Sequence, residues 1–403
     1  MPTPQKPTIL FVAEAVTLAH FARIVSLAKS LDPSEYDIVV ASDPRYLALE
    51  KPLPFAFYPI QSIPSSQFTQ ALAEGKPVYD AKTLTQYVEE DLLLLNKIKP
   101  DLVVGDFRLS LSISAPLAQV PYAAVVNAYW SPFADIVYPI PDLMLTKLLG
   151  VNLAQKLFNV VRPLVFALHA RPLNKARQKY GLPPLKHNLR EAYTSADFTL
   201  YTDIPEAVPM LQKPNTHYHL GPALWSTNTP LPEWWDSLPN DKPIVFVTLG
   251  SSGQSELLPM VLQALAELPL TIIAATAGKI QLTDLPDNVF VNDYLPIDVA
   301  CQRSQAVISN GGSMTTYQAF ASGVPVIGIA GNMDQLLNMQ AIEHLGAGIT
   351  LRADKASQPG IQQAVNALLH NPSYTQAAEK ITQTLAYYDP AKRFREVVAD
   401  ILH

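Results

Sequence analysis

Two glycines followed by hydroxyl and amide side chains form the strongest chemical pattern in the sequence. Residues 309–335 read SNGGSMTTYQAFASGVPVIGIAGNMDQ, and Gly311 and Gly312 lie there between an expected strand and an expected helix. Glycines leave backbone N–H groups uncovered at the positive end of a helix, where a phosphate binds readily. Asp334 and Gln335 begin a second expected helix, and their carboxylate and amide suit sugar hydroxyls. We therefore predict one ligand that carries both a phosphate and a sugar.

A plain strand-to-helix turn or a helix N-cap would explain either pattern alone. Two such patterns at the ends of consecutive strands favour a binding site instead. The G-x-G-x-x-G fingerprint of dinucleotide dehydrogenases and the Walker A pattern are both absent from the sequence.

Apolar runs of strand length alternate with helical periods, which predicts an α/β fold with parallel sheets. The expected strands are residues 8–12, 37–42, 101–106, 122–128 and 198–201, then 244–250, 270–278, 289–296, 306–312 and 324–330. Residues 20–31 are the first expected helix. We predict a Rossmann-like domain over 1–220, a proline-rich linker over 221–243, a second Rossmann-like domain over 244–388, and a helix over 389–403 that packs back on the first domain. The ligand is expected in the cleft between the domains, at the carboxyl ends of the strands.

The composition excludes several classes of protein. The chain has 403 residues and a net charge of -6, which suits two domains and argues against a general nucleic-acid binder. Its single cysteine excludes an internal disulfide framework. The N-terminus does not resemble a signal peptide, and no apolar run reaches the ~20 residues of a membrane span. We predict a cytoplasmic protein.

The glycine-rich segment resembles the donor-binding signature of the UDP-glycosyltransferase superfamily, which has the GT-B fold of two Rossmann-like domains facing a central cleft. The resemblance spans nearly the whole chain and includes the tripeptide YLP at 294–296 and the segment VFVTLGSSGQ at 245–254. It implies a nucleotide-sugar donor, with UDP favoured on family frequency, and no cofactor. The donor-binding residues that it implies are Ser251, Ser252, Tyr294, Asn310, Gly311, Gly312, Ser313, Thr315, Gln318, Asp334 and Gln335.

Four positions depart from the family pattern. Asn310 replaces a histidine that donates to phosphate, Met314 replaces a glycine, Gln318 replaces a glutamate that often grips the ribose, and Ile297 replaces a base-reading glutamine. These departures leave the identity of the nucleotide open.

The resemblance also implies a catalytic pair. His20 lies where the family has its general base, and Asp106 lies where the family has the aspartate that orients it. The implied reaction is an inverting, metal-independent displacement at the anomeric carbon. Arg23 is expected to be a solvated helix charge, and Glu14 is a weaker candidate for acceptor contact. Two alternatives stay open: an accessory protein that binds a nucleotide-sugar without catalysis, and an enzyme like UDP-N-acetylglucosamine 2-epimerase.

The acceptor is expected to be a small, lipophilic molecule that binds near aromatic side chains. Tyr129, Trp130 and Phe133 follow an expected strand and either line the acceptor pocket or pack under a loop. Residues 143–181 contain seven Lys or Arg and no Asp or Glu, and their leucines form a helical stripe with an expected kink at Pro163. This segment predicts either peripheral contact with an anionic membrane or an ordinary pair of packed helices.

Overall fold

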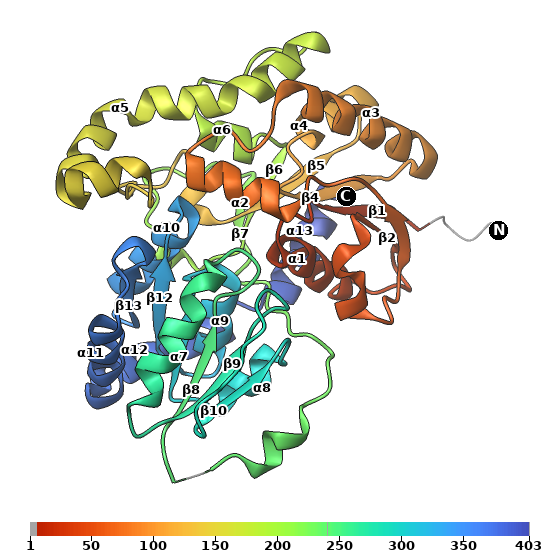
Figure 1. Cartoon of the computed structure of the whole chain (residues 1–403). Helices are drawn as coiled ribbons and strands as arrows, with labels where there is room; N and C mark the ends of the chain where they lie inside the picture. The colour runs from red at the N-terminus through yellow and green to blue at the C-terminus, as the bar shows by residue number, and fades with distance from the viewer. Residues whose placement is uncertain (1–5, 240, 403) are drawn as a thin grey trace. The chain divides into compact units, whose positions relative to one another are not determined.

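The protein contains two parallel sheets, each covered by helices (Figure 1). The structure is a computed structural model that describes residues 6–239 and 241–402. The chain divides into two compact units. Unit 1 comprises the residues up to Ile136, Lys156–Ala223 and the residues from Tyr388 onward, and unit 2 comprises Val137–Gln155 and Leu224–Tyr387. The prediction of an α/β fold with parallel sheets is confirmed.

The sheet of unit 1 has seven parallel strands in the order β3-β2-β1-β4-β5-β6-β7. The strands are β1 (Thr8–Ala13), β2 (Asp37–Ser42), β3 (Ala56–Pro59), β4 (Leu102–Asp106), β5 (Tyr122–Val126), β6 (Phe198–Tyr201) and β7 (His217–His219). The central strands are continuous runs of apolar residues because helices cover both faces of the sheet. Their carboxyl ends therefore meet at one edge of the sheet, where side chains from β1, β4, β5 and β6 converge.

The helices of unit 1 bury apolar faces, some of them against this sheet and others in a cluster of helix and loop residues. They are α1 (Leu18–Lys29), α2 (Ser65–Glu74), α3 (Ala81–Ile98), α4 (Leu111–Ala118), the second part of α5 (Met144–Lys179), α6 (Leu189–Thr194) and α13 (Pro390–Leu402). Helices α2 and α5 are among those that pack in the cluster. The C-terminal helix α13 belongs to unit 1, where Phe394 is fully buried with its ring 5.9 Å from that of Phe11.

Unit 2 repeats the architecture with six parallel strands in the order β10-β9-β8-β11-β12-β13. The strands are β8 (Ile244–Thr248), β9 (Thr271–Ala275), β10 (Val289–Asn292), β11 (Ala306–Ser309), β12 (Val326–Ala330) and β13 (Gly348–Arg352). The helices are α7 (Leu258–Ala266), α8 (Ile297–Gln302), α9 (Ser313–Ala321), α10 (Met333–His344), α11 (Gln358–His370) and α12 (Pro372–Tyr387). The order places β8, β11 and β12 side by side, so the loops that follow them are neighbours.

Short 3-10 helices connect several of these elements. They are η1 (Pro44–Glu50), η2 (Ala128–Trp130), η3 (Pro205–Ala207), η4 (Glu233–Ser237), η5 (Ser255–Leu257) and η6 (Ala353–Lys355).

The long helix α5 departs from two expectations. Its only residue with non-helical backbone angles is Gly150, at φ 70° and ψ 159°, so the kink lies there and not at Pro163. A glycine adopts such a conformation without steric cost, whereas the helix continues through the proline. Residues 137–155, which the sequence assigns to the first domain, cluster with unit 2. Within the described ranges, no helix has both the length and the apolar character needed to cross a membrane.

Candidate active site

His20 and Asp106 form a hydrogen-bonded pair at the carboxyl edge of the sheet in unit 1. His20 lies in the first turn of α1, directly after β1, and Asp106 is the last residue of the neighbouring strand β4. The Nδ1 atom of His20 is 2.7 Å from Oδ1 of Asp106, and the side chains are 15% and 1% exposed. At this distance a carboxylate requires the proton on Nδ1, so the lone pair of His20 is on Nε2. The pair can therefore accept a proton from a bound hydroxyl.

Arg23 completes this pair, and the expectation of a solvated charge was wrong. Its side chain is 9% exposed, and Nε and Nη2 donate to the two carboxylate oxygens of Asp106 over 2.7 and 2.9 Å. Nη2 also lies 3.0 Å from Nδ1 of His20. Because α1 places residues 20 and 23 on one face, the guanidinium lies beside the imidazole and competes for the same carboxylate.

The polar contacts extend from Arg23 across the next two strands. Arg23 donates to Oδ1 of Asn127, directly after β5, over 2.7 Å. The amide of Asn127 donates to Asp203, two residues after β6, over 3.2 and 3.3 Å, and the backbone N–H of Ala128 donates to the same carboxylate over 2.6 Å. Buried polar groups are costly unless they are bonded, so this row holds Asp106 and Arg23 in place. Sequence reasoning missed Asn127 and Asp203, although each follows a strand that ends at this edge.

Two opposing effects set the charge of Asp106. Burial by itself would raise the pKa of this carboxyl, but Arg23 and His20 outweigh burial and hold the pKa below its ordinary value. Asp106 therefore stays ionised at neutral pH, where it can orient His20 and stabilise the imidazolium that forms when His20 takes up a proton.

Phe107 fixes the plane of the imidazole and lines a hollow next to it. Its ring stacks on His20 with centroids 4.9 Å apart and planes at 7°. The hollow is partly open to solvent, and its cavity volume is about 20 Å³, roughly the room of one water molecule. It is lined by Val78, Tyr79, Leu84, Phe107, Leu109, His169, Pro172, Leu173, Leu189, Ala192 and Tyr193. This lining is apolar and aromatic, and it belongs to unit 1.

Of the three residues predicted to contact the acceptor, Trp130 contacts a residue that lines this hollow. Tyr129 and Trp130 are 1% and 9% exposed, and the ring of Trp130 meets Tyr193, which lines the hollow, edge to face at 5.0 Å. Phe133 contacts His217 instead, at 5.4 Å between centroids. Contact of all three with an acceptor stays a prediction.

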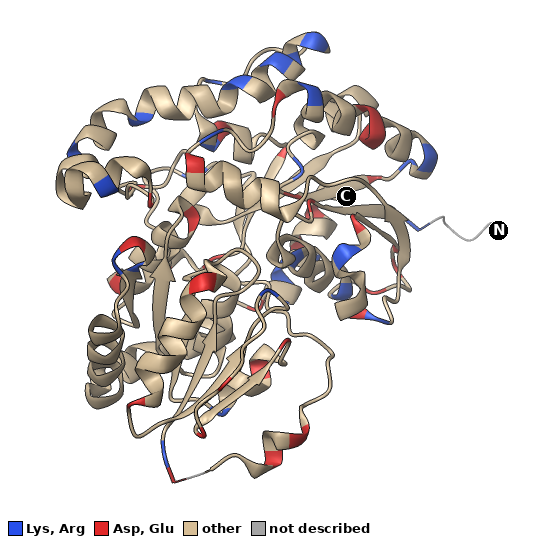
Figure 2. Cartoon of the chain, in the orientation of Figure 1, with Lys and Arg blue, Asp and Glu red and all other residues tan. Residues whose placement is uncertain are grey.

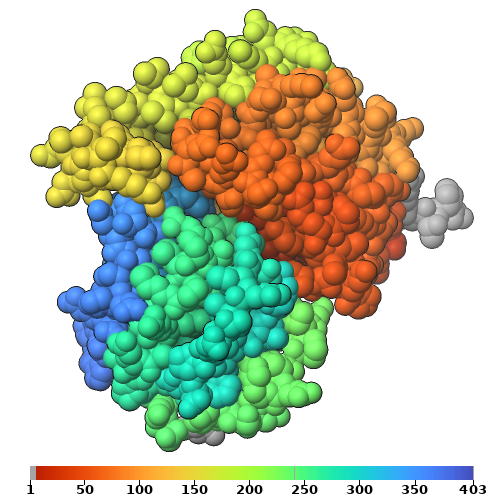
Figure 3. All heavy atoms as spheres, in the orientation of Figure 1, coloured from red at the N-terminus to blue at the C-terminus, as the bar shows by residue number. Residues whose placement is uncertain are grey.

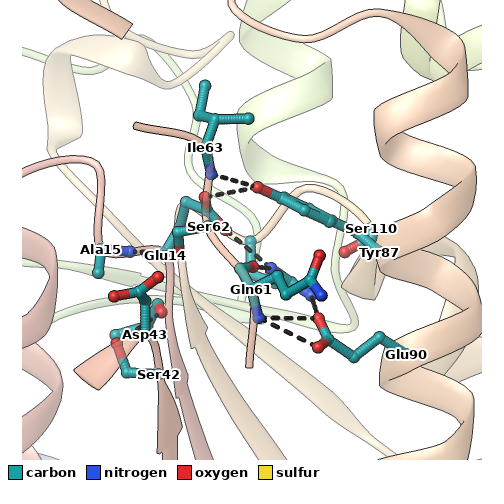
Figure 4. A network of polar contacts seen from close by, with 12 residues as sticks. Glu14, Ala15, Ser42, Asp43, Gln61, Ser62, Ile63, Tyr87, Glu90 and Ser110 are labelled. Atoms are coloured by element: carbon teal, nitrogen blue, oxygen red, sulfur yellow. Dashed lines mark hydrogen bonds and ion pairs between the residues drawn. The ribbon is translucent and has the colours of Figure 1, made fainter. Parts of the chain in front are cut away.

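Glu14 lies in a separate buried network of the same unit (Figure 4). Nη1 of Arg108 donates to Oε2 of Glu14 over 3.0 Å, and the hydroxyl of Tyr87 donates to Oε1 over 3.2 Å. Arg108 also pairs with Glu90 and Asp91 over 2.8 and 3.0 Å. Burial raises the pKa of Glu14, against the opposing effect of Arg108. Its side chain is fully buried, so this network serves to position the loop after β1 rather than to contact an acceptor.

In unit 2, the loops after β8 and β11 are joined through Asn310. Its Nδ2 donates to the hydroxyl of Ser252 over 3.2 Å, and its Oδ1 accepts from the backbone N–H of Gly312 over 3.1 Å. Gly312 is the N-cap of α9, whose first turn receives no side-chain cap. The positive end of the α9 dipole therefore lies at this loop without a side-chain cap.

The glycine at 311 is required by both its backbone and its neighbours. Its φ is 78°, and a Cβ there would lie 2.7 Å from Cγ of Met339. Its carbonyl accepts from Nδ2 of Asn338 over 2.8 Å, and the same amide donates to Thr316 over 3.0 Å. Asn338 therefore holds the loop after β11 in position.

The helix α10 begins with a capping box that uses Gln335. The side chain of Asn332 accepts from the N–H of Gln335 over 3.0 Å, and Oε1 of Gln335 accepts from the N–H groups of Gly331 and Asn332 over 3.0 and 3.3 Å. Its Nε2 lies 3.4 Å from the carbonyl of Ser252. Asp334 lies in the same first turn and is partly exposed. The structure thus brings the predicted donor residues of three loops together, and it gives Gln335 a structural contact that the sequence did not suggest.

The remaining predicted donor residues surround the same loops. Gln318 in α9 is 7% exposed, and among the described residues its Oε1 has no hydrogen-bond partner. Thr315 lies partly exposed in the first turn of α9, and Ser251 lies partly exposed after β8. The hydroxyl of Tyr294, after β10, donates to the carbonyl of Ala277 over 3.1 Å.

Residues 138–146 contribute to this side of unit 2, which the sequence did not indicate. The N–H of Asp142 donates to the carbonyl of Gly331 over 2.7 Å, and Nε2 of Gln254 lies 3.4 Å from Oδ2 of Asp142. A Cβ at Gly331 would lie 2.8 Å from that amide. Among residues 6–239 and 241–402, no group of three or more His, Cys, Asp or Glu side chains is placed to hold a metal ion.

Comparison with known proteins gives consistent matches. Residues 259–402 match the family model described as Erythromycin biosynthesis protein CIII-like, C-terminal domain. A PGL/p-HBAD biosynthesis rhamnosyltransferase of Mycobacterium bovis (strain BCG / Pasteur 1173P2) is 52% identical over 373 residues, which cover 93% of this chain and 83% of that protein. An inactive PGL/p-HBAD biosynthesis glycosyltransferase of the same strain is 49% identical over 264 residues, which cover 66% of this chain and 72% of that protein.

A solved structure shows the fold. The glycotransferase of kitacinnamycin has a TM-score of 0.75 at 16% identity, over 99% of this chain and 100% of that one. Together with the two parallel-sheet units, this likeness confirms the prediction of a GT-B fold.

Proposed function

The chain belongs to the family of the PGL/p-HBAD biosynthesis glycosyltransferases, and on this basis we propose that it moves a sugar from a nucleotide-sugar to a hydroxyl of a small, lipophilic acceptor. The observation that carries the proposal is the pair of His20 and Asp106, whose 2.7 Å contact leaves Nε2 of His20 as the proton acceptor. The rhamnosyltransferase among the relatives makes rhamnose the first sugar to test.

The proposed reaction is a direct displacement at the anomeric carbon. Nε2 of His20 takes the proton of the acceptor hydroxyl while its oxygen forms a bond to the anomeric carbon. The bond from that carbon to the diphosphate oxygen breaks, and the nucleoside diphosphate leaves with the electron pair. Asp106 then stabilises the imidazolium of His20. Attack opposite the leaving group inverts the anomeric configuration.

The donor is proposed to bind to the loops of unit 2. The N-terminal end of α9 supports a diphosphate site, because no side chain caps it and it carries the positive end of the helix dipole. The buried, unbonded Oε1 of Gln318 supports a further polar contact to the donor. Asp334 is proposed to accept from sugar hydroxyls. UDP as the nucleotide, the absence of a cofactor or metal, and a cytoplasmic location stay predictions.

The acceptor is proposed to enter the hollow beside Phe107, whose walls must move apart to admit it, because the cavity volume is about 20 Å³. The hollow is apolar and aromatic, which suits an aryl or alkyl group, and Phe107 connects it to His20. The hydroxyl of Tyr79 is buried in its wall without a hydrogen-bond partner among the described residues, and burial keeps the pKa of this tyrosine well above its ordinary value. Tyr79 is therefore a neutral donor for a polar group of the acceptor.

A panel of donors and acceptors tests the proposal. The protein is incubated with UDP-, TDP- and GDP-linked glucose and rhamnose and with phenols that carry alkyl chains of increasing length, and products are detected by mass spectrometry. We expect one nucleotide-sugar to give a glycoside, and His20→Ala to abolish it without changing the Kd of the nucleotide. Glycoside formation that is independent of His20 would refute the assigned role.

The accessory alternative makes a different prediction in the same experiment. The relative described as inactive gives this alternative weight. A non-catalytic protein would bind a nucleotide-sugar but transfer it to no acceptor, and it would show no slow hydrolysis. An epimerase would instead exchange the proton at C2 of UDP-N-acetylglucosamine with solvent deuterium, which NMR detects.

A further inference from the structure

One face of α5 leaves large apolar side chains in contact with solvent. In the part of α5 that belongs to unit 1, Leu157, Val160, Leu164 and Leu168 are 42%, 78%, 63% and 48% exposed. They recur every three or four residues and therefore form one stripe on the helix. The opposite side of this helix is buried, with Phe158, Phe166 and Leu173 each at most 5% exposed. The helix is thus packed on unit 1 by one side only, and the apolar stripe faces outward.

The same face continues as a row of cations. Arg171, Lys175 and Lys179 follow Leu168 at the same helical spacing, and Lys156 flanks the stripe at its start; all four are exposed. No carboxylate of the described chain is within ion-pair distance of Lys156, Arg171 or Lys175, and Lys179 contacts Glu89 only over 3.7 Å. Residues 143–190 contain no Asp or Glu, although the whole chain has a net charge of -6. Figure 2 shows Lys and Arg, without acidic residues, along the ribbon of α5.

We propose that this face, defined by Leu157, Val160, Leu164, Leu168, Lys156, Arg171 and Lys175, docks on an anionic lipid surface. The leucines and the valine would enter the boundary between headgroups and acyl chains, and the three cations would lie at the level of the anionic headgroups. Apolar area and positive charge together are the two contributions that stable peripheral binding requires. Figure 3 shows the atoms of α5, in yellow to yellow-green, at the molecular surface.

The charge favours a lipid surface over a second copy of the chain. A symmetric dimer through this face would bring Lys and Arg toward Lys and Arg, with no carboxylate on the face to pair with them. An anionic bilayer neutralises all three cations at once. The proposal concerns where the protein binds and stands independently of the transfer reaction, so it can be tested without an acceptor.

Vesicle co-sedimentation tests the proposal on the full-length chain. We expect binding to vesicles of phosphatidylglycerol and phosphatidylcholine, weak binding to phosphatidylcholine alone, and loss of binding as the salt concentration rises. Since a cation near the surface contributes about fivefold, K156Q/R171Q/K175Q should weaken the partition coefficient by up to about 100-fold. The pair V160E/L164E, at positions that are 78% and 63% exposed, should weaken it at least about tenfold.

Matched variants control for charge and for folding. L93E/L211E makes the same change of charge at two leucines that are 74% exposed elsewhere in unit 1, and K242Q/K355Q/K380Q removes three exposed lysines from unit 2. Both controls should bind vesicles like the wild type, and all variants should keep its Tm.

Three results would overturn the proposal. The first is no binding, or equal binding to anionic and neutral vesicles. The second is equal loss of binding in the α5 variants and in the controls. The third is a dimer by light scattering that V160E/L164E converts to a monomer, which would make the face a surface for self-association. Vesicle binding without any glycosyl transfer would leave this proposal standing and count against the proposed function.

Discussion

Replacing Asp106 by asparagine should impair both stability and transfer, because the carboxylate of Asp106 bonds to Arg23 and to His20. The carboxylate accepts from Nε and Nη2 of Arg23 over 2.7 and 2.9 Å, with both side chains at least nine-tenths buried. An amide offers one acceptor oxygen in place of two, which leaves the guanidinium buried and only partly bonded. Breaking a buried ion pair in this way costs roughly 3–5 kcal/mol, and the remaining bond from Arg23 to Asn127 favours the lower value, about 3 kcal/mol.

The same substitution should move the proton of His20. With the carboxylate gone, Nη2 of Arg23, which lies 3.0 Å from Nδ1, becomes its nearest charged donor. A guanidinium that donates to Nδ1 forces the imidazole proton onto Nε2, so the atom proposed as the base no longer has a lone pair. Loss of a general base slows a reaction by roughly 10²–10⁴. A thousandfold loss corresponds to about 4 kcal/mol of activation free energy.

The double variant Arg23→Met with D106N separates the two effects. Removing the unpaired guanidinium should restore more than about 1 kcal/mol of the unfolding free energy and allow His20 either tautomer, so the double variant should transfer faster than D106N alone. Urea unfolding and single-turnover transfer at saturating donor measure these quantities. Strictly additive effects in both assays, or a D106N enzyme with the wild-type rate, would refute the reasoning.

Three further predictions concern separate parts of the chain. Burial lowers the pKa of His219 from its ordinary 6.5 to about 4, so between these pH values His219 binds a proton only in the unfolded chain. The stability of the fold should therefore fall as the pH drops from about 6.5 to about 4. His219→Gln should make this fall smaller in a plot of Tm against pH. Gly311→Ala forces an L-residue to φ 78° against Met339, so it should lower the unfolding free energy by roughly 1–3 kcal/mol and weaken nucleotide binding. Gly312→Ala, at φ -72°, should lower the unfolding free energy less. Equal losses of unfolding free energy in calorimetry would contradict this account. Tyr79→Phe removes the proposed hydrogen-bond donor to the acceptor, so it should raise the KM of a polar aryl acceptor about tenfold and leave the donor Kd unchanged. An unchanged KM would place the acceptor elsewhere.

The strands that the sequence predicted are apolar runs, and they include every central strand of both sheets and the edge strand β10. The three strands that it missed are β3, β7 and β13, and each lies at the edge of its sheet. An edge strand is covered less completely, so it needs no continuous apolar run. β7 reads His-Tyr-His and is partly buried throughout, and β13 is partly buried after its first residue. Periodicity and hydrophobicity therefore carry too little signal to find such strands.

The candidate site was predictable where residues follow strands and unpredictable where they meet across the fold. His20 follows β1 and Asp106 ends β4, and their contact confirms the expected proximity of the two positions. Arg23 seemed to be an ordinary helix charge because nothing in its local sequence shows that Asp106 and Asn127 lie beneath α1. Gln335 is a similar case for one contact, since its approach to Ser252 depends on the order of the strands in unit 2, whereas its bond to Gly331 is local.

The role of His20 as the general base is the central claim, and one comparison tests it most directly. The single-turnover rate of sugar transfer is measured for the wild type and for His20→Ala, each with nucleotide-sugar bound at saturation and with the donor Kd determined separately. The account predicts an unchanged Kd and a rate that is lower by at least about a hundredfold. Transfer by His20→Ala at the wild-type rate would contradict it.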